Sequence, residues 1–425
     1  METSEVQKFN IKSFLSTKGA AILAASVAVV GIGTLAVSSS VADSDEVVLG
    51  VRADGQNIGG LDKSAAQKVF NDIAAQKIHK LTFRYGDQEF VITPEEINLK
   101  PLIDKATQEA LNFGRGGTTI ANFNDQVKSF LNGRDVHLTA EYDSTLLDEK
   151  LNAIAVQVNK DPVNAVCNLT SGNAIEKIPG VIGKKLNTEQ LAESLRDPLT
   201  TLNLPKGTIT LEPEDILPFV TTEDIAEIDS VLGTYSTYYY PGDRGDNIWL
   251  AANAISHKII KSSWTFSFND TVGERTWDAG YKVAGVIING RPAEDYGGGV
   301  CQVSSTLYNA VLLAGLTPTE RTPHYFQSTY VAPGRDATVA DGSLDFKFRN
   351  DLPHNVYLIA DAYGSTLSVY ILGTKADLGG AEIAIEREGS DMSPSIYRVW
   401  YNGNDVIKSE FLHTDVYETP KPRQD

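Results

Sequence analysis

The stretch from residue 297 to 310 carries the side chains of this chain best suited to chemistry. Three glycines and a valine lead directly to Cys301. Apolar residues at helical spacing follow, among them Val303 and Leu307, and Gly315 ends the pattern. We therefore predict a helix that begins at or near Cys301, where unpaired backbone N–H groups and the helix dipole favour a thiolate.

The glycines before the cysteine suit an activated nucleophile. Without side chains they allow a substrate backbone to approach closely, and they free N–H groups to stabilise an oxyanion. We predict substrate contacts from Gly298, Gly299, Gln302 and Ser304. The alternative is a buried structural cysteine in a tight turn, because free cysteines are among the most buried residues. Cysteine context alone does not decide between the two.

A cysteine nucleophile needs a general base, and three histidines were compared for that role. His324 is the best candidate, because it follows Pro323 in a loop rich in polar and aromatic residues. His257 is predicted in the middle of a helix, and His354 lies in a proline-containing turn. Both are weaker candidates for a base that must reach Cys301.

Charged residues near the histidine complete the predicted site. Asp336 could orient His324, and Arg335 or Arg321 could bind a substrate carboxylate in bidentate fashion. The alternative for each is an ion pair that holds the fold. We predict catalytic roles for Cys301, His324 and Asp336, and sequence separation does not show that these side chains meet in space.

Cysteine count and charge limit the other classes of function. Cys167 and Cys301 are the only two cysteines, and no CxxC spacing exists, so we do not predict a structural zinc site. The thiol chemistry considered for Cys301 needs no metal or organic cofactor, and we predict none. A Cys167–Cys301 disulfide is an alternative, but it would bury the proposed nucleophile. The formal net charge of −18 argues against a nucleic-acid partner and for a well-hydrated body.

The N-terminus has the sequence pattern of a membrane anchor or a signal peptide. Lysines precede an apolar-rich run without charges from residue 19 to 37, and acidic residues follow it. We predict a cytoplasmic tail at 1–18 and a transmembrane anchor at 19–41, giving a single-pass cell-membrane protein. A cleaved signal peptide ending near Ser40-Val41-Ala42 is the alternative. Either interpretation places the body outside the cytoplasm.

The body reads as α+β throughout. Residues 47–160 form a first module, with a hairpin at 81–92 around Gly86-Asp87 and a helix at 143–156. A shorter, degenerate repeat of the same theme follows at 161–224.

The most informative module spans residues 225–375, and a β-rich tail follows at 376–425. Within the module, a helix is predicted at 246–260 and a strand at 264–269. Further strands are predicted at 286–291, 344–350, 356–359 and 367–372.

The two front modules resemble the peptidoglycan-binding domain that often precedes VanW domains in extracytoplasmic bacterial proteins. The resemblance rests on three short motifs: Gly50-Val51-Arg52, Phe113-Gly114-Arg115-Gly116 and Asp161-Pro162-Val163. These motifs do not identify a ligand site.

Residues 232–373 resemble a VanW domain over nearly its whole length. The matching pieces include Phe266-Ser267-Phe268-Asn269, Gly297 to Gln302, His324, Pro333 to Val339, and Asp345-Phe346-Lys347-Phe348. The sequence departs from the family where Thr322 replaces a common histidine, which leaves His324 as the matching one.

The resemblance implies a cell-wall function. Some VanW-domain proteins are implicated as L,D-transpeptidases, which would use Cys301 to form a thioester with a peptidoglycan stem peptide and then cross-link it to a second stem. Water as the acceptor would make the same site a carboxypeptidase. The alternatives are a non-catalytic peptidoglycan-binding or scaffold protein linked to glycopeptide resistance, and a thiol-redox protein using both cysteines.

Overall fold

A computed structural model describes residues 45–170, 172–288 and 291–419 of the chain. Its described part is a mixed α+β protein that divides into two compact units. The first unit takes its described residues from Met1–Lys160 and Lys184–Asp215, and the second from Asp161–Gly183 and Ile216–Asp425. The chain therefore passes between the units three times, and the predicted repeat at 161–224 is divided between them.

The first unit surrounds its own hydrophobic core, to which Phe70, Phe83 and Leu147 contribute fully buried side chains. Helix α2 packs against α3, and α5 packs against α6. Its elements are β1 (Val51–Ala53), β2 (Gln56–Asn57), α2 (Lys63–Lys77), β3 (Leu81–Tyr85), β4 (Gln88–Ile92), η2 (Glu95–Ile97), β5 (Lys100–Pro101), α3 (Ile103–Asn112), α4 (Thr119–Asn132), β6 (Arg134–Val136), β7 (Ala140–Glu141), α5 (Ser144–Val158), β10 (Gly183–Lys185), α6 (Thr188–Thr200), β11 (Thr208–Thr210) and β12 (Glu214–Ile216).

Local signals explain most of this unit. The Gly86-Asp87 turn joins β3 to β4 in an antiparallel hairpin, as predicted, and β11 adds to the other edge of β3 in parallel. Asp143 caps α5 by accepting hydrogen bonds from the N–H groups of Thr145 and Leu146. Helix α4 was not predicted.

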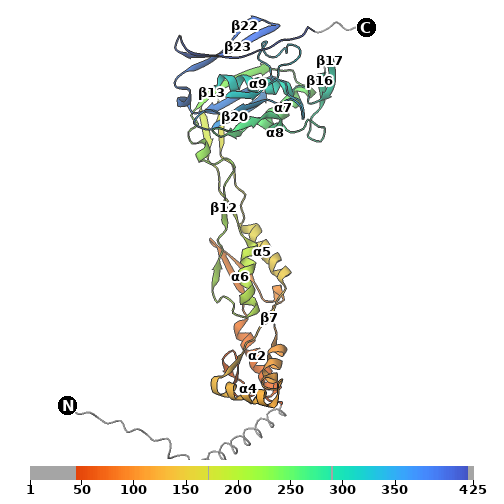
Figure 1. Cartoon of the computed structure of the whole chain (residues 1–425), viewed down its shortest axis with the longest axis vertical. Coiled ribbons are helices and arrows are strands. Elements are labelled where there is room, and N and C mark those ends of the chain that lie inside the picture. Colours follow the sequence, from red (N-terminus) through yellow and green to blue (C-terminus); the bar gives the residue numbers. More distant parts are fainter. Residues whose placement is uncertain (1–44, 171, 289–290, 420–425) are drawn as a thin grey trace, which may run out of the picture. The chain divides into compact units, whose positions relative to one another are not determined.

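The second unit contains four-stranded and three-stranded sheets around two long helices (Figure 1). Its elements are β8 (Val166–Leu169), β9 (Ile175–Ile178), η3 (Glu223–Ile225), β13 (Ser230–Tyr238), α7 (Asp243–Ile255), β14 (Lys258–Ile260), β15 (Thr265–Ser267), α8 (Phe268–Val272), β16 (Val283–Ile288), β17 (Arg291–Tyr296), α9 (Val300–Leu313), β18 (Thr317–Glu320), β19 (Lys347–Arg349), β20 (Val356–Tyr363), β21 (Thr366–Gly373), η4 (Lys375–Leu378), β22 (Glu382–Ser390), β23 (Ser393–Asn402) and β24 (Asp405–Thr414).

Helix α9 is the central element of this unit. It packs against β13 and β21 of the sheet ordered β13-β21-β20-β14, while α7 packs against β20 and α9 (Figure 1). The helix comes very close to β13 at Gly233, where a Cβ would lie 2.4 Å from the carbonyl oxygen of Ala310. Val303, Leu307 and Val311 are buried on α9, as their helical spacing predicts.

Two predicted elements in this unit end where an element of another type begins. The helix predicted at 246–260 ends at Ile255, because His257 adopts a left-handed backbone (φ +56°) and residues 258–260 pair with β20 instead. The strand predicted at 264–269 stops at Ser267, which caps the short helix α8 by accepting from the N–H of Asp270. The predicted C-terminal β-rich tail is the antiparallel sheet β22-β23-β24.

The predicted cytoplasmic tail and membrane anchor, residues 1–41, lie outside the described residues. Among the residues that are described, none belongs to a helix with the length and apolar character needed to cross a bilayer.

Candidate active site

Cys301 lies in the first turn of α9, as predicted. Gly299 precedes the helix with a φ of +113°, a backbone conformation that side chains rarely adopt. Gly298 is also required, because a Cβ there would lie 2.7 Å from the carbonyl group of Ala284. Cys301 itself is half-buried, whereas Val300 and Gln302 on either side are buried.

The polar residues that follow Cys301 hold the neighbouring loop against α9. Ser304 Oγ donates to the carbonyl oxygen of Ala337 (2.6 Å). Ser305 Oγ accepts from the backbone N–H of Ala337 (2.9 Å). Asn309 Nδ2 donates to the carbonyl oxygen of Arg335 (2.7 Å). Buried polar groups require such partners. Both residues adjacent to Asp336 in the sequence are thus fixed to the helix that carries Cys301.

The structure brings Cys301, His324 and Asp336 together. His324 Nδ1 lies 2.6 Å from Asp336 Oδ2, and the backbone N–H of His324 donates to the same oxygen at 2.6 Å. The side chains of His324 and Cys301 also interact, and each shifts the pKa of the other. In its thiol form, Cys301 Sγ donates to the carbonyl oxygen of Val339 at 3.3 Å. This is the nucleophile–base–orienter arrangement of cysteine acyltransferases and hydrolases.

The electrostatics of the three groups favour an ion pair between thiolate and imidazolium. Burial alone would raise the pKa of Cys301, but His324 and the more distant Arg275 outweigh it and lower that pKa. Burial alone would lower the pKa of His324, but Asp336 and Cys301 raise it to about 9. The pKa of Asp336 is lowered despite burial, by His324 first and by Arg321 and Tyr417 as well. A lowered thiol pKa is typical of reactive cysteines.

Among the described residues, two backbone N–H groups at the start of α9 are available as oxyanion donors. The N–H groups of Val300 and Gln302 donate to the carbonyl oxygens of Gly297 and Gly299, both at 3.0 Å. Within the described part of the chain, the N–H of Cys301 has no such acceptor. The N–H of Gly299 likewise has no acceptor there, so the predicted oxyanion donors between Gly299 and Gln302 reduce to the amides of Gly299 and Cys301.

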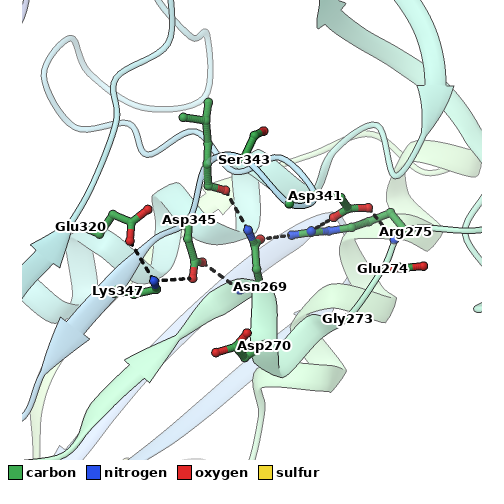
Figure 2. A pocket seen from close by; sticks show the side chains of 12 residues that line it. Asn269, Asp270, Gly273, Glu274, Arg275, Glu320, Asp341, Ser343, Asp345 and Lys347 are labelled. Carbon is green, nitrogen blue, oxygen red and sulfur yellow. Dashed lines mark hydrogen bonds and ion pairs between the residues drawn. The ribbon is translucent and has the colours of Figure 1, made fainter.

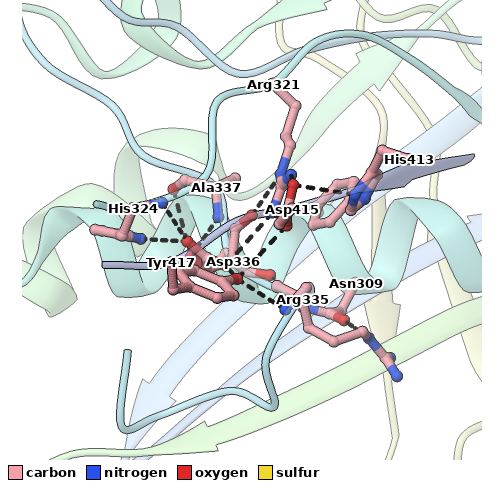
Figure 3. A network of polar contacts seen from close by, with 12 residues as sticks. Asn309, Arg321, His324, Arg335, Asp336, Ala337, His413, Asp415 and Tyr417 are labelled. Atoms are coloured by element: carbon pink, nitrogen blue, oxygen red, sulfur yellow. Dashed lines mark hydrogen bonds and ion pairs between the residues drawn. The ribbon is translucent and has the colours of Figure 1, made fainter. Parts of the chain in front are cut away.

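A buried polar network supports Asp336 from the C-terminal end of the chain (Figure 3). Tyr417 Oη donates to Asp336 Oδ1 and accepts from the N–H of Gly334 at 2.8 Å. Arg321 donates to both carboxylate oxygens of Asp415 at 2.6 and 2.7 Å, and its Nε donates to the carbonyl oxygen of Asp336 at 2.7 Å. The residues that follow β24 therefore fix the orienting carboxylate.

The predicted substrate-binding arginines are committed to the protein itself. The guanidinium of Arg321 forms ion pairs with Asp415 and Asp336. Arg335 donates to Asn309 Oδ1, eight residues beyond Cys301 on α9, and its guanidinium lies over the ring of Tyr235 at 5.2 Å. Both arrangements favour the alternative of a fold-holding role.

Two polar residues predicted to contact substrate are also engaged within the protein. Gln302 Nε2 donates to Thr237 Oγ1 at 3.1 Å and to the carbonyl oxygen of Tyr238 at 2.9 Å. Ser304 is fully buried and bound to Ala337. They tie α9 to β13 and to the loop that carries Asp336.

Two residues near the thiol were not predicted from the sequence to belong to the site. Tyr330 Oη lies 3.5 Å from His324 Nε2. Arg275 is buried beside Gly297 and contributes to the lowered pKa of Cys301. Neither has a distinctive local motif that would have indicated its position.

Arg275 also borders a polar cleft of about 480 Å³ (Figure 2). Its guanidinium pairs there with Asp341 and donates to Asn269 Oδ1 at 2.7 Å. Lys347 pairs with Glu320 at 2.9 Å across the same cleft. Ion pairs thus engage both cations of the cleft, whose lining also carries the carboxylates of Asp270, Glu274 and Asp345. In the described residues, no group of three His, Cys, Asp or Glu side chains could share a metal ion.

The other cysteine and the two weaker histidine candidates do not belong to this site. Cys167 and Cys301 are both free thiols, and Cys167 is buried in a separate core cluster, where burial raises its pKa to about 11. His257 Nδ1 lies 3.3 Å from Tyr357 Oη, and His354 pairs with Asp377 at 2.7 Å.

Fold and site together define the class: an α+β protein whose second unit holds a Cys–His–Asp cluster at a helix start. Two family models match the chain. One is described as "VanW like protein" and covers residues 243–372, from α7 into β21. The other is described as "Putative peptidoglycan binding domain" and covers residues 90–204. The chain belongs to the VanW-like family, with a peptidoglycan-binding region on the N-terminal side.

Two curated relatives support this membership. The chain is 37% identical to "Uncharacterized protein YoaR" of Bacillus subtilis over 270 residues, which is 62% of this chain and 84% of that protein. It is 32% identical to "Vancomycin B-type resistance protein VanW" of Enterococcus faecalis over 146 residues, 32% of this chain and 52% of that protein. No solved structure matches the chain. The matched ranges overlap the modules at 47–160, 161–224 and 225–375, whose boundaries stay predictions.

Proposed function

We propose that this chain is an extracytoplasmic peptidoglycan-binding protein whose VanW domain is a cysteine-dependent L,D-transpeptidase. The observation that carries the catalytic part is the contact of Cys301 with His324, which Asp336 orients. The peptidoglycan-binding part draws on the family match at residues 90–204. A peptidoglycan partner in turn supports a location at the cell wall, with residues 19–41 as the proposed anchor.

The proposed first step acylates the cysteine. The Cys301 thiolate attacks the carbonyl carbon before the terminal D-alanine, and the Cys301 N–H stabilises the oxyanion. The C–N bond then breaks, and the His324 imidazolium gives its proton to the departing amine. D-alanine leaves, and the stem peptide remains as a thioester on Cys301.

The proposed second step transfers the acyl group. The side-chain amine of a neighbouring stem peptide attacks the thioester carbonyl, and neutral His324 accepts the proton that this amine loses. The C–S bond breaks and a new amide cross-link forms, which restores the thiolate and the imidazolium. Water in place of the amine would release a shortened stem peptide, the carboxypeptidase outcome. No metal or organic cofactor enters either step.

The second candidate is a non-catalytic peptidoglycan-binding or scaffold protein linked to glycopeptide resistance. The comparisons favour this candidate, because the family descriptions name binding and a relative is named for vancomycin resistance. In this case the Cys301 turn would serve only the fold. Catalysis is favoured instead by the lowered pKa of a half-buried thiol that an oriented histidine contacts.

Incubating the full chain with purified disaccharide-tetrapeptide separates the two candidates. We expect dimers that lack one D-alanine, detected by mass spectrometry, and their loss in a Cys301→Ala variant by at least about a thousandfold. Cys167→Ala is the matched control, because that thiol is buried elsewhere. Shortened monomers alone would indicate carboxypeptidase activity. Unchanged substrate with folded, reduced protein would favour the binding protein.

A further inference from the structure

Arg244, in the first turn of α7, is a half-buried arginine that lies beside the start of α9, the helix that carries Cys301. Its stem fills the space beside Gly299, where a Cβ would lie 3.0 Å from Arg244 Cγ. Its Nη2 donates to Gln302 Oε1 at 3.3 Å. Arg244 therefore lies against the residues on both sides of Cys301, on the helix turn where the nucleophile is held.

The guanidinium of Arg244 has no acidic partner among the residues that the structure describes. The two acidic residues closest to it in sequence are taken by another cation, because Lys282 pairs with Asp243 at 3.2 Å and with Asp246 at 2.5 Å. The neutral amide oxygen of Gln302 satisfies only one of its five N–H donors.

The other arginines near the site differ in this respect. Arg275 pairs with Asp341, and Arg321 pairs with Asp415 and Asp336. Arg335 is stacked on Tyr235 and bound to Asn309, farther along α9. A planar guanidinium with free donors beside a nucleophile is suited to bidentate recognition of a carboxylate.

We propose that Arg244 binds a carboxylate of the stem peptide that is presented to Cys301, an inference that rests on the function proposed above. The carboxylate of the leaving D-alanine directly follows the scissile amide bond, so a cation next to the nucleophile can reach it. Binding there would place the scissile carbonyl at Sγ and select stem peptides with a free C-terminus. A diaminopimelate side chain offers a second carboxylate with the same chemistry.

The test measures binding in the full-length Cys301→Ala variant, so that no turnover intervenes. Calorimetry would compare a diaminopimelate tetrapeptide with its C-terminal amide and with its side-chain amide. We expect the free acid to bind about tenfold more tightly than one of the amides, and Arg244→Ala to remove that preference. The amide that shows the effect identifies which carboxylate is bound.

Two further variants control for nonspecific effects. Arg244→Lys keeps the charge without the bidentate geometry and should retain part of the preference. Arg349→Ala should retain all of it, because Arg349 pairs with Asp351 in an exposed turn. A preference that persists unchanged in Arg244→Ala, or equal weakening of all three peptides, would overturn the inference.

The outcome is independent of catalysis. If the wild-type chain does not turn over substrate but its acid preference depends on Arg244, the proposed enzyme fails and the carboxylate site stands. If turnover occurs while Arg244→Ala keeps the acid preference, the enzyme stands and the carboxylate site fails.

Discussion

The proposed reactivity of Cys301 depends on three residues: Cys301 itself, His324 and Asp336. Burial alone would leave the thiol protonated, as it does at Cys167, whose pKa is about 11. At Cys301, the interaction with His324 outweighs burial and lowers the pKa of the thiol. Asp336 in turn raises the pKa of His324 to about 9, and the imidazolium lowers the pKa of Cys301.

We predict that the Cys301 thiolate forms below the ordinary thiol pKa. The ultraviolet absorbance of the thiolate, followed against pH, should show a step that His324→Gln moves upward, since burial then acts unopposed. Cys167→Ala should leave this low step unchanged. A low step that survives His324→Gln would contradict the ion pair.

Turnover by the wild-type chain should fall as pH rises through about 9, where His324 loses its proton.

Asp336→Asn should lower turnover on the order of a hundredfold to ten-thousandfold, because the amide cannot stabilise the imidazolium. Steady-state rates measured by D-alanine release would quantify the loss. Asp377→Asn is the matched control, since Asp377 forms the same kind of pair with His354 away from the thiol. Equal losses in both variants would mean that the defect lies in folding, which thermal unfolding of each variant would show.

At the scale of elements, the site depends on how α9 is held on two sides. Thr237 and Tyr238 of β13 bind Gln302 on one side of the helix. On another side, Ser304 and Ser305 bind the loop at Ala337. The turn before α9 fits against β16 without space for a side chain at Gly298. A helix start held in this way fixes the nucleophile to within the tolerance that acyl transfer requires.

Gly298→Ala should therefore destabilise the chain by about 1–3 kcal/mol, because the added Cβ meets backbone atoms that cannot move independently. Gly285→Ala is the matched control on β16, where a Cβ meets no atom within 4 Å, and should change stability by no more than about 0.5 kcal/mol. Urea unfolding measures both. Similar values for the two variants would show that the turn relaxes at little cost.

At the scale of the whole molecule, the peptidoglycan-binding match and the proposed thiol chemistry belong to different stretches of the chain. The peptidoglycan-binding match ends at residue 204, and Cys301 lies in the VanW match. Because the net charge is −18, attraction to anionic wall polymers cannot drive association.

We predict that the full chain co-sediments with purified sacculi and that Cys301→Ala binds equally well. Added salt should not weaken the binding, since it does not depend on attraction between opposite charges. Albumin, also acidic, serves as the control for trapping. Loss of binding in Cys301→Ala alone would show that retention depends on a covalent thioester, and no sedimentation of either form would argue against a peptidoglycan partner.

Local patterns in the sequence determined several features that the structure retains. The glycine–cysteine stretch predicted a helix start at Cys301, and the Gly86-Asp87 turn predicted the β3–β4 hairpin. Both depend on backbone conformation and periodicity over a few residues, which neighbouring residues largely dictate. The family resemblance, drawn from ordered motifs, is confirmed by the comparisons.

Other features were decided only by the tertiary structure. The sequence proposed Arg321 and Arg335 for substrate, but long-range partners such as Asp415 and Asn309 occupy them. Arg244 emerged because Lys282, distant in sequence, takes the acidic residues beside it. A side chain's local sequence shows its charge, but whether that charge is neutralised depends on residues that only folding brings within a few ångströms.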